Sequence, residues 1–112
     1  MPTLAAIPEQ RRSKRLADLR HGVAAAVAGQ PNTEVWLFGS LARGDWDAYS
    51  DVDLLAIGPS EPAAEALADA LPSAHLGDDV LPLTHERWHE LRSSEHPYWR
   101  AIGAAALRVD QP

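Results

Sequence analysis

Two carboxylates set two residues apart, Asp51 and Asp53, are the side chains in this sequence best suited to bind a metal ion. They precede the apolar run Leu54–Ile57, and an earlier apolar run covers Val35–Phe38, so the segment reads as two strands joined by an elbow. Alternate residues of a strand point to the same face, which would place the two carboxylates on one side, roughly 7 Å apart along the backbone. Such a pair suits a divalent metal ion.

The elbow between the two strands combines a predicted anion site with an unusual density of acid. Gly39 lacks a Cβ and lets the backbone approach a ligand, and Ser40 caps a short helix whose free N–H groups attract an anion. Arg43 returns to the face of Ser40 three residues later and can meet the same anion. The segment also carries four aspartates, Asp45, Asp47, Asp51 and Asp53. A phosphate chain could therefore approach only with metal between, which predicts metal-assisted phosphoryl or nucleotidyl transfer.

These residues carry a family resemblance. Gly39-Ser40, ten residues, then Asp51-Val52-Asp53 is similar to the signature of the DNA polymerase beta-like nucleotidyltransferase superfamily. The fuller pattern, Gly-Ser-x-Ala-Arg-Gly at 39–44 and Ser-Asp-x-Asp-Leu at 50–54, resembles its minimal branch (MNT), which includes the antitoxins of HEPN/MNT toxin–antitoxin pairs. The general layout extends the resemblance from about Val35 to Val109.

The resemblance implies a fold and a ligand set. The fold would be an α/β (α+β type) nucleotidyltransferase fold, a three-stranded mixed sheet packed by about four to five helices. Asp51 and Asp53 would hold two Mg²⁺ ions about 3.5–4 Å apart, with Asp79 as the third carboxylate and Asp78 as the alternative for that position. Gly39, Ser40 and Arg43 would hold the β- and γ-phosphates of ATP.

The resemblance also implies a reaction and a partner. The protein would transfer AMP from ATP to a hydroxyl, a tyrosine hydroxyl in the leading hypothesis, of a HEPN-type ribonuclease toxin and so neutralise it. A different class of function stays open, a non-catalytic antitoxin that acts by binding alone.

Composition limits the other function classes. A chain of 112 residues is expected to form a single domain over residues 1–112, and no segment is apolar for long enough to span a membrane. The net charge of −6 argues against direct nucleic-acid binding, because phosphate repulsion is not offset. The absence of cysteine excludes disulfides and thiolate metal sites, and a cytoplasmic location is the expectation.

Periodicity and breaker residues predict the elements that position the elbow. The first two strands should be antiparallel neighbours, because Ser40 and Asp51 would serve one ligand, and Pro82 fits best on an edge strand. The last helix should present Trp99, Ile102, Ala106 and Val109 on one face. The predicted helices cover 8–28, 60–72, 85–94 and 97–109, with Ser60 and Thr84 as caps, and the predicted strands cover 35–38, 51–57 and 78–83.

A second motif predicts different chemistry. His85-Glu86-Arg87-Trp88-His89 satisfies His-Glu-x-x-His, in which two histidines one turn apart bind zinc and the glutamate activates water. A further ligand is needed, and the usual extension requires glycine and histidine where Arg92 and Glu95 stand. A zinc hydrolase is therefore a distant alternative, weighed against a solvent-facing helix.

Overall fold

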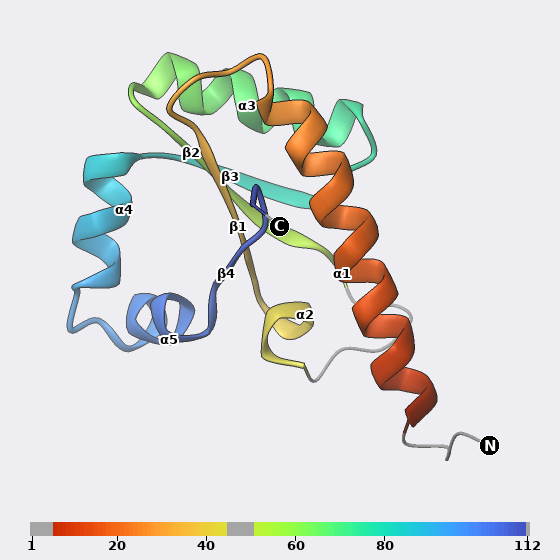
Figure 1. The fold of residues 1–112 in the computed structure, drawn as a ribbon. Helices are drawn as coiled ribbons and strands as arrows, with labels where there is room; N and C mark the ends of the chain where they lie inside the picture. The colour runs from red at the N-terminus through yellow and green to blue at the C-terminus, as the bar shows by residue number, and fades with distance from the viewer. Residues whose placement is uncertain (1–5, 45–50, 112) are drawn as a thin grey trace.

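The computed structural model describes residues 6–44 and 51–111, with the side chains of residues 6–9 and of Ser40 outside that description. Helices and strands alternate along most of the chain (Figure 1). In chain order they are α1 (Ala6–Val27), β1 (Glu34–Phe38), α2 (Ser40–Arg43), β2 (Asp53–Gly58), α3 (Glu61–Ser73), β3 (Asp79–Thr84), α4 (His85–Arg92), α5 (Pro97–Ala105) and β4 (Leu107–Arg108).

The strands form one mixed sheet in the order β3-β2-β1-β4. The predicted antiparallel pairing of the first two strands is confirmed, with Phe38 opposite Asp53. β3 runs parallel to β2 and lies at the edge, where Pro82 was expected, because proline offers no N–H to a further strand. The register of β2 and β3 sets Asp53 beside Asp79.

The expectation of three strands is wrong, because the described chain has a fourth. α5 ends at Ala105, and Leu107–Arg108 pairs antiparallel with β1. Val109 is fully buried and its N–H donates to the Val35 carbonyl, 2.8 Å away. It packs with α1 and α3, across the sheet from Trp99 and Ile102, so these residues do not share one helix face.

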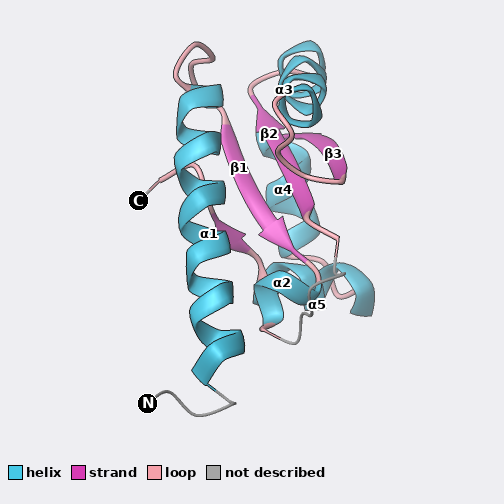
Figure 2. Ribbon diagram, turned by 90° about the vertical axis from the view of Figure 1, so that its right-hand side faces the viewer, coloured by secondary structure: helices cyan, strands magenta, loops and turns pink. Residues whose placement is uncertain are grey.

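Each face of the sheet is covered by a pair of helices. β1 is apolar on both faces: Val35 and Leu37 point into one core, and Trp36 and Phe38 point toward the other. The first core is closed by α1 and α3 and the second by α4 and α5, as the two perpendicular views show (Figures 1 and 2). β1 is therefore held from both sides, which fixes the position of the turn that follows it.

The predicted helix caps are confirmed. Ser60 Oγ accepts the N–H of Ala63 at 3.3 Å, and Thr84 Oγ1 accepts the N–H of Arg87 at 3.1 Å. Each bond satisfies one of the N–H groups that the first turn of a helix leaves without a partner. α3 and α4 therefore begin where the sequence indicated, and α3 continues one residue past Pro72.

Candidate active site

The turn after β1 brings the backbone against an acidic side chain. Gly39 has φ +79°, a conformation that residues with a Cβ rarely adopt. A Cβ built on Gly39 would lie 2.5 Å from Oδ2 of Asp53, closer than real contacts allow. α2 starts directly after this glycine, and the N–H of Arg43 donates to the Gly39 carbonyl at 3.1 Å. The glycine is thus needed both for the turn and for space beside the carboxylate.

Asp53 lies at the centre of a cluster of carboxylates. It is the first residue of β2, between Phe38 at the end of β1 and Asp79 at the start of β3. Burial is the main cause that raises its pKa, followed by the negative charges of Asp79, Asp51 and Asp78, while Arg43 lowers it. The carboxylates of the site therefore repel one another. Carboxylate oxygens are suitable ligands for a divalent cation, which would relieve this repulsion.

Asp51 is close to this cluster but not where strand alternation predicted it. β2 begins at Asp53, so Asp51 precedes the strand and is exposed, and the expectation of a strand from residue 51 is wrong. The intervening Val52 is held by the loop before β3: its carbonyl accepts the N–H groups of Asp78 at 2.8 Å and Asp79 at 3.3 Å. After burial and Asp79, the negative charge of Asp51 is the next cause that raises the pKa of Asp53.

The two candidates for the third carboxylate have different surroundings. Oδ2 of Asp78 accepts the N–H of Val52 at 2.7 Å, which fastens the start of β2 to the start of β3. Asp79 is exposed and stands beside Asp53 in the register of the two strands. Both side chains are exposed, so what distinguishes them is the hydrogen bond of Asp78 to the Val52 backbone and the position of Asp79 beside Asp53.

The carboxylates are near one another without forming a closed ligand set. Within residues 6–44 and 51–111, no group of three or more histidine, aspartate or glutamate side chains is arranged to hold a metal ion. Asp51, Asp53 and Asp79 would have to converge from exposed or half-exposed positions. A cation between them would supply the attraction for that convergence.

The cationic side of the site depends on helix α2. Arg43 ends α2, is exposed, and lines a hollow together with Gly39 and Asp53. The backbone of Ser40 opens the helix, but the Ser40 side chain and the elbow residues Asp45, Asp47 and Ser50 lie outside the described part of the chain.

Sequence reasoning missed the residue that holds α2 in place. Arg12 of α1 donates from Nε to the carbonyl of Leu41 and from its terminal nitrogen to that of Ala42, both at 3.1 Å. These are carbonyls at the end of a helix, which a cation stabilises. Arg12 belongs to a run of basic residues in the first helix, a pattern typical of a solvated helix face or of a basic docking surface. Nothing near it in sequence indicates a partner 29 residues away.

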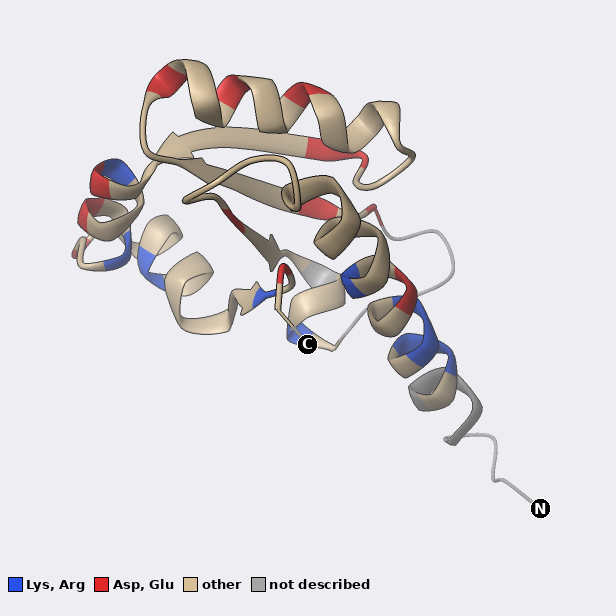
Figure 3. Ribbon diagram, turned by 45° about the horizontal axis from the view of Figure 1, so that its top comes forward, with Lys and Arg blue, Asp and Glu red and all other residues tan. Residues whose placement is uncertain are grey.

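Charge is unevenly distributed over the fold. Basic residues gather along the N-terminal half of α1, whereas acidic residues follow α3 and mark the starts of β2 and β3 (Figure 3). Some of the basic side chains are structural, since Arg20 donates to the carbonyls of Arg108 and Gln111 at 3.1 and 2.9 Å.

The His-Glu-x-x-His segment lies at the opposite end of β1. The ring nitrogens of His85 lie 3.3 Å from a Glu34 carboxylate oxygen and 2.6 Å from the Asn32 carbonyl, while His89 is exposed on α4. His85 thus fastens the start of α4 to the start of β1. The structure gives the zinc hydrolase no support, because these contacts engage both ring nitrogens of His85.

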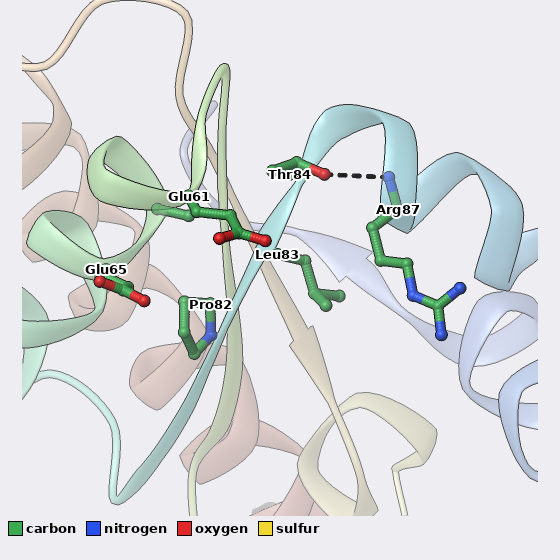
Figure 4. Close-up of a pocket in the computed structure, with 7 residues that line it drawn as sticks. Glu61, Glu65, Pro82, Leu83, Thr84 and Arg87 are labelled. Carbon is green, nitrogen blue, oxygen red and sulfur yellow. Dashed lines mark hydrogen bonds between the residues drawn. The ribbon is translucent and has the colours of Figure 1, made fainter.

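A separate hollow of about 230 Å³ lies at the far end of β3, between α3 and α4 (Figure 4). Glu61 and Glu65 reach it from α3, and Arg87 reaches it from the first turn of α4. Thr84, at the end of β3, shares it, whereas Asp79 begins that strand. This hollow is therefore distinct from the carboxylate cluster.

Comparison with known proteins identifies the class of the chain. The nucleotidyltransferase domain family matches residues 23–98, more than half of the 112 residues, and the chain therefore belongs to that family. Comparison with curated proteins gave no match.

Among solved structures, the fold is similar to a chain of a crystal structure described as a toxin–antitoxin with AMP-PNP. The TM-score is 0.52 and the sequence identity is 20%, over 83% of this chain and 73% of that one. At this identity the likeness concerns the fold. No helix in the described ranges has the length and apolar character needed to cross a membrane.

Replacing Gly39 tests whether the turn is as tight as its geometry indicates. Gly39→Ala should lower the free energy of unfolding by about 1–2 kcal/mol, because alanine resists a positive φ and its methyl group meets Asp53. Gly29→Ala is the matched control, since a Cβ at Gly29 has nothing within 4 Å. Urea unfolding measures both, and an equal effect in the two variants would contradict the assignment.

Replacing Asp53 tests the crowding of charge. In the metal-free protein, Asp53→Asn should raise the free energy of unfolding at neutral pH by on the order of 0.5 kcal/mol, the size of an exposed charge interaction. The pKa of Asp53 is raised in the folded state, so the gain should be absent below about pH 4, where the carboxyl is protonated in both states. It should grow as the pH rises and be complete above the folded-state pKa. Asp69→Asn, on the exposed face of α3, is the control and should show no such pH dependence.

Proposed function

We propose that the protein is a Mg²⁺-dependent nucleotidyltransferase that moves AMP from ATP to a hydroxyl of a partner toxin and so silences it. The observation that carries the proposal is the placement of Asp53 beside Asp79. Both lie at the end of the sheet where the Gly39 turn and Arg43 also lie. The chain belongs to the nucleotidyltransferase domain family, and in this arrangement the aspartates would bind metal ions while Arg43 would bind phosphate.

Asp51, Asp53 and Asp79 are the residues proposed to hold the metal. Two Mg²⁺ ions would neutralise the triphosphate and polarise its α-phosphate. The raised pKa of Asp53 supports this role, because burial and the charges of the neighbouring aspartates disfavour its ionised form, which a cation would favour. Gly39, Ser40 and Arg43 are the proposed phosphate-binding residues; Gly39 supports this role because it makes a turn that residues with a Cβ rarely adopt and leaves space beside Asp53.

The transfer itself is a displacement at phosphorus. The acceptor oxygen forms a bond to the α-phosphorus, the bond to the oxygen bridging the α- and β-phosphates breaks, and pyrophosphate leaves. Asp79 takes the proton of the acceptor hydroxyl and passes it to water. Its exposure supports this role, because an acceptor carried by another protein can reach it.

The acceptor we propose is a tyrosine of a HEPN-type ribonuclease toxin. The resemblance of residues 39–44 and 50–54 to MNT antitoxins supports this partner, as does the fold shared with a chain of a toxin–antitoxin structure containing AMP-PNP. A small domain with open carboxylates also needs an acceptor that closes over it. AMP on that tyrosine would add bulk and negative charge at a site that must admit RNA.

A second candidate is an antitoxin that acts by binding alone. It is favoured by one observation, that the described residues contain no ready-made group of three metal-binding side chains. The two candidates differ in whether the toxin changes mass.

The test is incubation of the protein with ATP, Mg²⁺ and the product of its neighbouring gene, followed by intact mass spectrometry. The partner should gain one or more AMP units, and Asp51→Asn or Asp53→Asn should reduce the rate by at least about 100-fold, since each removes a metal ligand. His89→Gln, at an exposed position of α4, is the matched control and should transfer at the wild-type rate. A tight complex without any mass gain would favour the binding-only antitoxin.

A further inference from the structure

A hollow of about 410 Å³ continues from the carboxylate cluster onto helix α5. One end is lined by Gly39, Arg43 and Asp53, and the rest by Phe38 and four residues of α5, namely Tyr98, Ala101, Ile102 and Ala105. α2 and α5 lie at the same end of the sheet in both perpendicular views (Figures 1 and 2). The volume falls within the range of cavities that hold small organic ligands.

The two ends of this hollow differ in chemistry. The end at Arg43 and Asp53 carries charge, and the α5 end offers aromatic and aliphatic surface. A nucleotide has a similar division, with charged phosphates at one end and a base with flat π-faces at the other. A ligand whose phosphates lie at the Gly39 turn would extend its remaining part toward α5.

We propose that the α5 end of this hollow binds the nucleoside portion of the nucleotide, with the base against Tyr98 and Ile102. The proposal rests on the proposed function, because it takes the phosphates to lie beside Gly39 and Arg43. It assigns to α5 a role in substrate binding beyond its role in covering the sheet.

Tyr98 is held in a position suited to stacking. The residue is 59% exposed, and its ring meets that of Trp99 edge-on, with centroids 5.4 Å apart and planes at 80°. Trp99 in turn packs against the core closed by α4 and α5. The Tyr98 N–H donates to Nδ1 of His96 at 3.3 Å, which caps the first turn of α5. The ring is therefore anchored while much of its surface stays open.

The composition of the α5 end predicts weak selectivity among bases. Of the described residues that line it, Tyr98 alone carries a polar side-chain group, its hydroxyl, and no amide or charged group stands ready to read a base edge. Stacking tolerates any base, because each has a π-face. ATP, GTP, CTP and UTP should therefore bind within about 10-fold of one another.

The test compares two ligands and two matched variants of the full chain. Calorimetry measures binding of ATP and of inorganic tripolyphosphate, each with Mg²⁺, to the wild type, Ala101→Phe and Ala104→Phe. Ala101 lines the hollow and Ala104 does not, although both are exposed residues of α5. Ala101→Phe should weaken ATP by about 10-fold or more and leave tripolyphosphate within about 2-fold, whereas Ala104→Phe should alter neither.

A second variant keeps the inference testable if phenylalanine disturbs the helix. Tyr98→Ala removes an exposed ring and should weaken ATP by about 10-fold without affecting tripolyphosphate. Equal affinity of the wild type for ATP and tripolyphosphate would overturn the inference and leave the proposed function standing. Unchanged ATP affinity with slower transfer would assign the hollow to the acceptor instead, and binding of neither ligand would overturn both.

Discussion

The crowding of carboxylates around Asp53 is the constraint on which the rest of the structure depends. Folding brings Asp53 beside Asp79 and within reach of the charges of Asp51 and Asp78, and it partly removes Asp53 from water. Each effect opposes ionisation. The fold offsets part of this repulsion locally, through Arg43 and through the hydrogen bond that the Val52 N–H donates to Asp78. The remaining repulsion makes this an acidic end of the sheet, where the negative charge favours a cation.

Packing in the rest of the fold fixes the position of this acidic end of the sheet. β1 is packed on both faces, so its end at Phe38 delivers the Gly39 turn to a fixed position beside Asp53. Arg12 fastens α2 from a distant helix, which fixes the helix that carries Arg43. The two halves of the site thus come from different parts of the chain, and tertiary packing rather than local propensity aligns them.

The sequence predicted those features that local chemistry determines. The antiparallel pairing follows from the expectation that Ser40 and Asp51 serve one ligand, and the edge position of Pro82 and the two helix caps follow from the chemistry of proline, serine and threonine. Features set by distant contacts do not follow from the sequence. The helical spacing of Trp99, Ile102, Ala106 and Val109 predicts helix over β4, whereas pairing with β1 draws Val109 into the other core. Strand alternation predicts Asp51 on a strand that begins only at Asp53. The sequence predicts the helix that contains Tyr98 and Ile102 but not the hollow that it forms with Gly39 and Asp53. The roles of the individual site residues remain predictions.

The central claim is that the acidic end of the sheet binds a divalent cation. Thermal unfolding with increasing Mg²⁺ tests it most directly. A ligand that binds only the folded state raises the melting temperature with its concentration. We predict a progressive rise for the wild type and for Asp69→Asn, and a much smaller rise for Asp53→Asn. An equal rise in Asp53→Asn, or none in the wild type, would contradict the account.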